Sequence, residues 1–467
     1  MEYLSRVLAY TTDTLPFKFY PMCGQLKLSH LMFADDLLLF SKGDVTSIMV
    51  LLRSFATLSS ASDVQMNSTK TNAYFNGVSR ELKTDILQIS GVIEGQLPFR
   101  YLGIPVTCGR LKKADCPVLV EKTVSRIRSF GTKKLSYAGR LVLVNSVLTA
   151  LYSYWINIFL IPKGVLNKIN SICRNYLWEG SVDYFKVPQV SWEKVCVLKT
   201  EGGLGIRDSL SWNIAAIGKL VWWIYSCPDR LWVKWVHQIY LKGTPWSTYT
   251  PSGDVSWGWK VVARVKDKLA LGYSNDQWLL DNKGYTVSSG YDLIRLKFQE
   301  VQWHKYLWCS WCYPKHQFIG WLITREALKL KDKCYALGIS SDATCLLCGL
   351  DDESHSNLFL KCEYNRRILT IMAGLCQVAI PDANIFLWIN GLQASSVQKK
   401  VIMSVILATF YYIWMQRNEA RIDDAVLRPE LLCSQIRKEV KCRLSTKFKP
   451  GICTRDITWF NLVRMSM

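Results

Sequence analysis

Short blocks of apolar residues alternate with polar ones near the start of the chain. Residues 28–33 and 37–40 are two apolar runs, and residues 34–36 (Ala-Asp-Asp) separate them. Two short strands joined by an acidic turn account for this pattern, because Asp is a common turn residue. Apolar side chains at three- and four-residue spacing then predict a helix over 45–60. The first part of the chain is therefore expected to be α+β.

A longer apolar segment covers residues 141–162, which carry no charge and are numerous enough to span a bilayer. However, Asn145, Thr149, Ser153 and Asn157 recur at every fourth position. This spacing places a polar stripe along one face of a helix. Such a helix packs in a globular domain more readily than in lipid, so we expect no membrane span. Further along, a helix is predicted over 399–421.

The charge of the chain is strongly positive, with 58 Lys and Arg against 37 Asp and Glu, a net charge of +21. Nucleic acid is the commonest partner of such a chain, and an anionic membrane surface is the alternative. Residues 100–186 contain 14 Lys and Arg against four acids. The candidate phosphate-binding residues in this region are Arg126, Arg128, Lys133, Lys134 and Arg140. The alternative is a solvated basic helix face.

The sixteen cysteines are spread along the chain and do not form a compact disulfide framework. The chain opens with Met1-Glu2-Tyr3, and no apolar signal segment follows. We therefore expect a reducing compartment, nuclear or cytoplasmic, and not secretion.

Four residues of types that commonly bind metal ions lie within a stretch of 18 positions. Cys345, Cys348, His355 and Cys362 follow the pattern C-x2-C-x6-H-x6-C. Three thiolates and one imidazole make a closed tetrahedral set for Zn²⁺, which leaves no open position for a substrate. The spacing thus predicts a structural zinc site, and the alternative is a group of buried core cysteines.

Two other motifs are interpreted as having no ligand. Cys309 and Cys312 form a second C-x2-C without an evident second pair. We interpret it as coincidence, the alternative being a metal site completed by His304 or His316. The glycine cluster at 201–205 lacks the Lys-Ser or Lys-Thr of a phosphate loop and predicts a tight turn.

The acidic pair Asp35-Asp36 is the main candidate for catalytic chemistry. Two adjacent carboxylates repel each other, and a hard divalent ion such as Mg²⁺ relieves that repulsion. The alternative is a solvated turn. Residues 28–40, Leu-Ser-His-Leu-Met-Phe-Ala-Asp-Asp-Leu-Leu-Leu-Phe, resemble the catalytic palm hairpin of reverse transcriptases, and more narrowly that of plant LINE-type (non-LTR) retrotransposons. Further motifs that match this family, in the same order, are Met1-Glu-Tyr-Leu-Ser-Arg6, Asn67 with Lys70, Tyr101-Leu-Gly-Ile-Pro105, Leu135-Ser-Tyr-Ala-Gly-Arg140 and Glu201-Gly-Gly-Leu-Gly-Ile-Arg207.

This resemblance implies RNA-directed DNA polymerase chemistry with RNA and DNA as template and primer. Asp35 and Asp36 would hold the catalytic Mg²⁺ ions, and Lys70 would lie near the incoming nucleotide. The first catalytic Asp of the family, the fingers and the endonuclease would all precede Met1. We therefore expect this chain alone not to polymerise. The alternative function is a non-catalytic, nucleic-acid-binding zinc protein derived from a transposable element, and a third reading is a non-functional product that folds only in part.

The resemblance also implies a domain order. It predicts an α+β partial polymerase palm, then mainly α-helical thumb-like and connector regions, and a small zinc-binding domain like the one that follows the polymerase in these plant elements. The expected boundaries are 1–105 for the palm, 106–186 for the basic thumb-like region, 187–300 for the Trp-rich connector, 301–370 for the zinc-binding domain and 371–467 for a basic helical tail.

Overall fold

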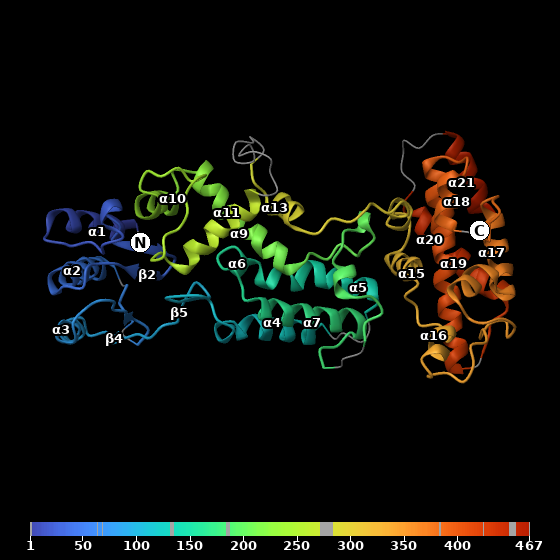
Figure 1. Cartoon of the computed structure of the whole chain (residues 1–467), viewed down its shortest axis with the longest axis horizontal. Coiled ribbons are helices and arrows are strands. Elements are labelled where there is room, and N and C mark those ends of the chain that lie inside the picture. Colours follow the sequence, from blue (N-terminus) through green and yellow to red (C-terminus); the bar gives the residue numbers. More distant parts are fainter. Residues whose placement is uncertain are drawn as a thin grey trace. The chain divides into compact units, whose positions relative to one another are not determined.

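The chain folds into two compact units, each built from separate stretches of sequence (Figure 1). One unit comprises Met1–Pro117, Tyr154–Lys163 and Leu210–Arg295, and the other comprises Val118–Ser153, Gly164–Ser209 and Leu296–Met467. The computed structural model describes residues 2–62, 64–67, 69–130, 135–183, 187–270, 284–382, 384–423, 425–447 and 454–466.

The first unit is mixed α and β. Its helices are α1 (Glu2–Thr14), α2 (Val45–Ala61), α3 (Arg80–Ser90), α6 (Ser153–Ile156), α9 (Ser209–Ser226), α10 (Leu231–Val236), α11 (Trp257–Ala270) and α13 (Val287–Ile294). Its strands are β1 (His30–Phe33), β2 (Asp36–Leu39), β3 (Asn72–Ala73), β4 (Ile93–Glu94), β5 (Phe99–Tyr101) and β6 (Ile104–Val106). In the described part of the chain they form two-stranded sheets, with β1–β2 and β5–β6 antiparallel and β3–β4 parallel.

The hairpin and helix predicted near the start are confirmed. Strands β1 and β2 pair directly, with Phe33 opposite Asp36, and Ala34 takes the left-handed conformation that the tight turn needs. Helix α2 begins after Asp44, whose carboxylate accepts the backbone N–H of Ser47 as an N-cap. Helices α1 and α2 pack together around a small core, made by Leu4, Leu8, Leu51 and Leu58.

The Trp-rich sequence forms a second core in this unit. Trp246 and Trp259 are buried among aliphatic residues of α9, α10 and α11. The Tyr240 ring stacks on Trp259 with centroids 4.6 Å apart, and the Trp259 indole N–H donates to the Tyr249 hydroxyl at 2.9 Å. A buried indole usually needs such an acceptor. These tryptophans therefore stabilise the unit by packing.

The second unit is mainly helical. Its helices are α4 (Pro117–Ser129), α5 (Tyr137–Leu143), α7 (Lys163–Glu179), α8 (Trp192–Val195), α14 (His304–Leu307), α15 (Pro314–Thr324), α16 (Lys331–Ala336), α17 (Glu363–Leu375), α18 (Ile385–Gly391), α19 (Ser396–Asp423), α20 (Pro429–Ser445) and α21 (Thr454–Ser466). Helices α15, α17 and α20 pack against α19, and the stretch 401–410 of α19 is buried on all sides (Figure 1). The helix predicted over 399–421 is confirmed as the central part of α19.

The apolar segment 141–162 is not the single helix that its spacing predicted. It divides into the end of α5, the π-helical turn η4 (Val144–Leu148), the 3₁₀ turn η5 (Ala150–Tyr152) and α6. The polar residues contribute to these breaks, because the hydroxyls of Ser146, Thr149 and Ser153 donate to backbone carbonyls three or four residues earlier. No helix in the described residues is both long and apolar enough to cross a membrane.

The glycine cluster at 201–205 forms the tight turn that was predicted. Gly202 and Gly205 both have positive φ, and a side chain on Gly203 would collide with the Val197 carbonyl. The Gly202 carbonyl accepts hydrogen bonds from the Trp321 indole and the Arg325 guanidinium. The turn therefore fixes α15 in place.

Candidate metal centre and basic surfaces

Three cysteine thiols from two separate elements meet in the second unit. Cys345 and Cys348 lie on a tight turn that Gly349 closes, with positive φ and its N–H donating to the Cys345 carbonyl at 2.9 Å. Cys362 lies at the junction between the π-helical turn η8 (Asn357–Lys361) and α17. The three sulfur atoms lie within 4.8 Å of one another. Within the described ranges, this is the group of potential metal ligands that the fold assembles.

The cluster has the dimensions of a zinc–thiolate site. A tetrahedral ion with Zn–S bonds of about 2.3 Å separates its sulfur ligands by about 3.8 Å. The Sγ atoms of Cys345 and Cys362 are 3.9 Å apart, and both side chains are buried. Zinc would therefore fit between them with little movement of the backbone. Cys345, Cys348 and Cys362 would hold the ion, which would supply a covalent-like cross-link between the turn and α17.

The surroundings of the thiols also change their pKa values in opposite directions. The hydrogen-bonding contact with the Cys362 sulfur, together with the backbone N–H groups of Cys348 and Leu347, lowers the pKa of Cys345 to about 6 despite its burial. The same sulfur contact and burial raise the pKa of Cys362. One thiolate is thus favoured in the absence of metal, and metal ligation requires thiolates.

His355 is not a member of the three-sulfur group. Its Nε2 atom accepts the backbone N–H of Leu328 at 3.3 Å, which places the proton on Nδ1. Burial, with a smaller effect of Lys333, lowers the pKa of His355 to about 4, so the ring is neutral as a metal ligand must be. Ligation through either ring nitrogen would require the contact with Leu328 to break. His355 as fourth ligand stays a prediction.

A buried ion pair connects the metal-binding segment to α19. The Arg417 Nε donates to the Glu353 carboxylate at 2.9 Å, and its Nη2 donates to the same oxygen. The backbone N–H of Lys331, at the start of α16, also donates to Glu353 at 2.9 Å. Both charged side chains are almost completely excluded from solvent, at 1% and 0% exposure. The sequence alone does not predict this pair, because neither residue carries a local signal.

The predicted catalytic pair lies at the tip of the β1–β2 hairpin. Asp35 and Asp36 are both exposed, and Phe33 beside them is 62% exposed. Burial, the Asp36 carboxylate and Tyr154 together raise the pKa of Tyr101 in β5, so the Tyr101-Leu-Gly-Ile-Pro105 motif lies near the hairpin tip. Among the described residues no third carboxylate, histidine or cysteine joins the two aspartates in a metal-binding group.

Lys70 is exposed on a turn that Asn67 stabilises. The Asn67 side-chain oxygen accepts the backbone N–H groups of Thr69 and Lys70 at 3.1 and 3.2 Å. Lys70 makes no ion pair with Asp35 or Asp36 among the described contacts. Its predicted role near a nucleotide stays a prediction.

The five predicted phosphate-binding residues divide into different environments. Arg126 is exposed on α4 and lies over the Phe130 ring, whereas Arg128 pairs with Asp183 at 3.0 Å on the surface. The Arg140 guanidinium donates to the carbonyls of Leu177 and Trp178 at the end of α7, at 3.4 and 3.3 Å. It therefore caps that helix. Lys133 and Lys134 lie outside the described residues.

Arg126 contributes to a shallow groove between α4 and the turns η4 and η5. The groove has a volume of about 710 Å³, and Lys122 and Arg126 are its cations against one acid, Glu121. Ser125, Ser129 and Ser146 add hydroxyl groups, and Val147, Ala150 and Leu151 give the groove an apolar floor. The two cations could contact a phosphate backbone at the rim of the groove.

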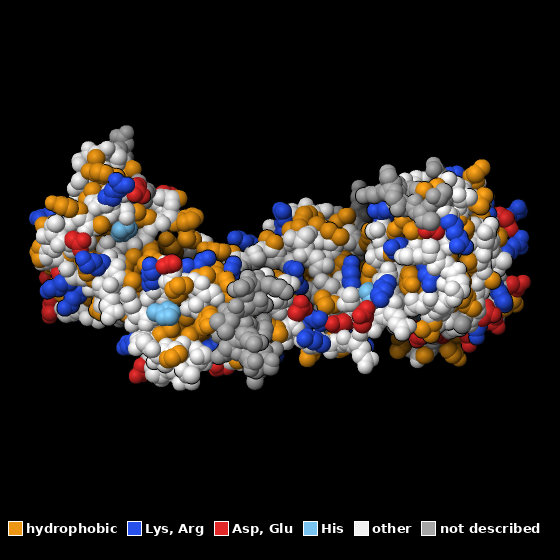
Figure 2. Space-filling view, turned by 90° about the horizontal axis from the view of Figure 1, so that it is seen from above, with side chains coloured by type: hydrophobic (Ala, Val, Ile, Leu, Met, Phe, Trp, Pro, Cys, Tyr) orange, Lys and Arg blue, Asp and Glu red, His pale blue; other side chains and the backbone are white. Residues whose placement is uncertain are grey.

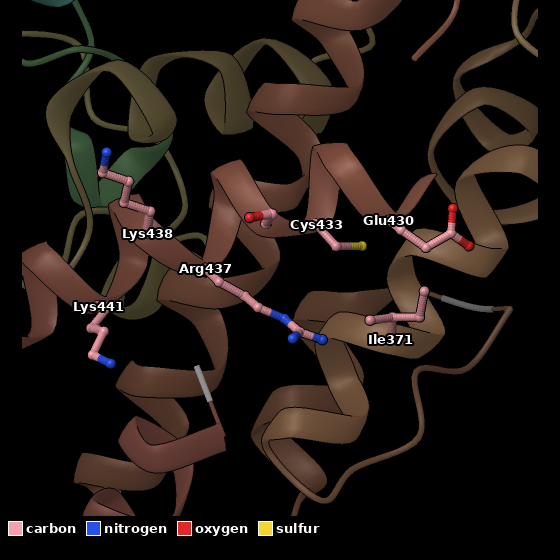
Figure 3. A pocket seen from close by; sticks show the side chains of 7 residues that line it. Ile371, Glu430, Cys433, Arg437, Lys438 and Lys441 are labelled. Atoms are coloured by element: carbon pink, nitrogen blue, oxygen red, sulfur yellow. The ribbon is translucent and has the colours of Figure 1, made fainter. Parts of the chain in front are cut away.

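A second basic cavity, which the local sequence does not predict, lies between α17 and α20. It has a volume of about 520 Å³ and is lined by Ile371, Glu430, Cys433, Ser434, Arg437, Lys438 and Lys441. The Arg437 guanidinium reaches from α20 toward Ile371 of α17 (Figure 3). Its buried Nε has no hydrogen-bond partner. Elsewhere Lys and Arg side chains are scattered over the visible face of the molecule (Figure 2).

Comparison with known proteins places the three-cysteine cluster in a recognised kind of domain. Residues 285–368 match the family described as zinc-binding in reverse transcriptase. An Arabidopsis thaliana protein named "Putative ribonuclease H protein" is 32% identical over 164 residues, which is 34% of this chain and 26% of that protein. An "Uncharacterized mitochondrial protein" of the same plant is 23% identical over 145 residues, 28% of this chain and 94% of that protein.

These matches cover limited parts of the molecules compared. The chain spans about a quarter of the length of the first relative, and the family match lies in and around the segment that contains Cys345, Cys348 and Cys362. The predicted zinc-binding character of this segment is confirmed at the level of its family and its thiol cluster. Residues 285–368 are thus similar to the zinc-binding domain of reverse transcriptases, and the chain shares limited similarity with two plant proteins.

Proposed function

We propose that this chain corresponds to the palm-to-zinc-domain part of a non-LTR retrotransposon reverse transcriptase, and that by itself it binds template and primer without extending the primer. The observation that carries the proposal is the three-thiol cluster within a segment that matches the reverse-transcriptase zinc-binding family. With His355 as the predicted fourth ligand, the site would have no open position, and its zinc would be structural.

The positive charge supports nucleic acid as the partner. The net charge of +21 is attracted to phosphate backbones irrespective of sequence. The groove with Lys122 and Arg126, and the cavity with Arg437, Lys438 and Lys441, offer two basic concave surfaces in the second unit. Binding of this kind releases counterions and weakens as salt rises.

The hairpin supports the absence of synthesis by this chain. Two-metal phosphoryl transfer requires carboxylates that clamp both ions. Asp35 and Asp36 are exposed, and the part of the fold that is described brings no third ligand to them. The alternative function, a nucleic-acid-binding zinc protein without polymerase chemistry, is favoured by the same observation.

A primer-extension assay with Mg²⁺ or Mn²⁺ tests the catalytic half of the proposal. The chain is expected to bind an RNA–DNA template-primer and to add no nucleotides. The double variant Asp35→Asn/Asp36→Asn is expected to bind equally well, because the substitutions lie outside the two basic surfaces. Template-dependent synthesis that this double variant abolishes would contradict the inactivity and would establish the aspartates as catalytic.

The salt dependence of binding tests the other half of the proposal, that the chain binds nucleic acid through its basic surfaces. Replacing both Lys122 and Arg126 by Ala is expected to reduce the slope of log K against log salt by up to about 1.8 for duplex DNA, since each lost phosphate contact removes about 0.9. The measurement is fluorescence anisotropy of labelled duplex across a salt titration.

Two control variants show whether a change in the salt slope comes from lost phosphate contacts, from the lower net charge or from lower stability of the fold. Replacing exposed Lys42 and Arg53 in the first unit removes the same charge and is expected to leave the slope nearly unchanged. Arg140→Ala is expected to lower the free energy of unfolding by about 1–3 kcal/mol without changing the slope, because its guanidinium already donates hydrogen bonds to carbonyls at the end of α7. Equal slopes for all variants, or binding that is independent of salt, would refute the assignment of the groove.

A further inference from the structure

The Cys309–Cys312 motif, which sequence spacing alone presented as a coincidence, forms a built feature of the second unit. The two sulfur atoms face each other at 3.3 Å, and both side chains are buried, Cys309 at 8% and Cys312 at 1% exposure. The backbone N–H of Cys312 donates to the Cys309 carbonyl at 3.2 Å, which closes the turn between α14 and α15. The thiols therefore meet because the backbone holds them there.

Three other elements hold this turn from outside. Arg443 of α20 donates to the carbonyls of Ser310 and Cys312 at 2.7 and 3.1 Å. Ser404 of α19 donates to the Trp311 carbonyl at 3.1 Å, and Gln317 of α15 donates to the Cys309 carbonyl at 2.6 Å. With its carbonyls fixed in this way, the turn has little freedom to separate the two sulfurs.

The described ligands do not make a metal site here. No third cysteine, histidine or carboxylate joins the two sulfurs in the part of the chain that the structure describes. The Nε2 of His304 contacts Glu300 at 2.7 Å, and that of His316 faces Glu439 at 3.6 Å. The alternative of a second metal site completed by either histidine is therefore not supported by their positions.

We propose that Cys309 and Cys312 are a vicinal dithiol that a hydroperoxide converts into an intramolecular disulfide. The ionised sulfur of Cys309 attacks one peroxide oxygen, the O–O bond breaks, and hydroxide leaves. The resulting sulfenic acid is attacked by the Cys312 sulfur, the S–S bond forms, and water leaves with the Cys312 proton. Hydroxide takes the proton that Cys309 released, so two thiols and one hydrogen peroxide give one disulfide and two waters.

The order of the two steps follows from the environment of each thiol. The hydrogen bond from the Cys312 thiol, against burial, lowers the pKa of Cys309 to about 7. The same contact and burial raise the pKa of Cys312. Cys309 is thus the sulfur that ionises and attacks, and Cys312 is the resolving thiol. A small oxidant such as peroxide suits this nearly buried site better than a bulky disulfide.

Trypsin separates this pair cleanly from the other cysteines. Cleavage after Lys305 and Lys315 yields a peptide of residues 306–315 that contains these two cysteines alone, whereas exposed Cys108 lies in the peptide 101–110. The zinc-loaded chain is treated with equimolar hydrogen peroxide, alkylated, digested and analysed by mass spectrometry. The expected product is peptide 306–315 lighter by two hydrogens and without alkyl groups, while Cys108 remains alkylated.

Single variants keep the test decisive. Cys312→Ala is expected to accumulate a sulfenic acid at Cys309 that dimedone traps, and Cys309→Ala is expected to leave Cys312 reduced. Dithiothreitol should restore both thiols of the unsubstituted chain. The proposal would be overturned if peroxide oxidised Cys108 while both cysteines of peptide 306–315 were still alkylated. Equal amounts of dimedone-trapped sulfenic acid in the Cys312→Ala and Cys309→Ala variants would also overturn it.

Discussion

Replacing Cys362 by Ser is expected to abolish zinc binding and to unfold the segment around the metal centre. Cys362 is fully buried and joins α17 to the turn that carries Cys345 and Cys348. Structural zinc in small domains contributes an apparent 10–16 kcal/mol or so at neutral pH. This is comparable to the whole stability of a typical domain, about 5–15 kcal/mol. Loss of the ion should therefore outweigh any other single change in this segment.

The measurement combines zinc content with urea unfolding, followed in the presence and absence of a chelator. Cys376→Ser is the matched control, because Cys376 is also a buried cysteine near α17 but does not belong to the cluster. The control is expected to keep its zinc and to lose only the smaller free energy of burying a hydroxyl. If Cys362→Ser retained zinc, or if both variants unfolded alike, the cluster would not be a metal centre.

Replacing Arg417 by Met is expected to destabilise the second unit by about 3–5 kcal/mol, the usual cost of leaving one partner of a buried ion pair uncompensated. Glu353 accepts the Nε of Arg417 and the backbone N–H of Lys331 with one oxygen, while its second oxygen has no partner. Without Arg417, the carboxylate would remain buried with the backbone hydrogen bond alone.

A double-mutant cycle measures this interaction. The combination Arg417→Met/Glu353→Leu should recover much of the loss, because no unpaired charge is then buried. The control is the exposed pair of Arg367 and Glu430, at 66% and 55% exposure, for which Arg367→Met should cost less than about 1 kcal/mol. Equal losses at the buried and the exposed pair, with no recovery in the double variant, would show that the ion pair does not hold α19 to the metal-binding segment.

Local periodicity predicted those elements that depend on local sequence. The β1–β2 hairpin follows from two apolar runs around an acidic turn, and α2 and α19 follow from their apolar spacing. The thiol cluster was also predicted, because the C-x2-C spacing of Cys345 and Cys348, with Cys362 close behind in the sequence, is typical of zinc ligands. These features need little information about the rest of the chain.

The parts that were not predicted depend on contacts between distant residues. The break in 141–162 arises where hydroxyl groups compete for backbone carbonyls, which periodicity does not record. The sequence suggests that Arg140 is a surface cation, but its guanidinium donates hydrogen bonds to carbonyls at the end of α7, nearly forty residues away. Likewise Glu353 and Arg417 are 64 positions apart.

The division of the chain into units also depends on contacts between distant residues. The structure forms two units that each take up three separate stretches, and the five consecutive regions expected from the sequence stay a prediction. Composition changes along the chain can locate a Trp-rich or a basic region, but they cannot show which regions share a core. The palm and thumb assignments therefore stay predictions that rest on the family resemblance.

Zinc K-edge X-ray absorption on the purified, reduced chain, together with its zinc content, tests the central claim most directly. The account predicts one zinc per chain with three sulfur ligands at about 2.3 Å and one nitrogen at about 2.0 Å, the nitrogen being lost in His355→Ala. A folded chain that contains no zinc, or whose zinc is surrounded by oxygen ligands alone, would contradict it.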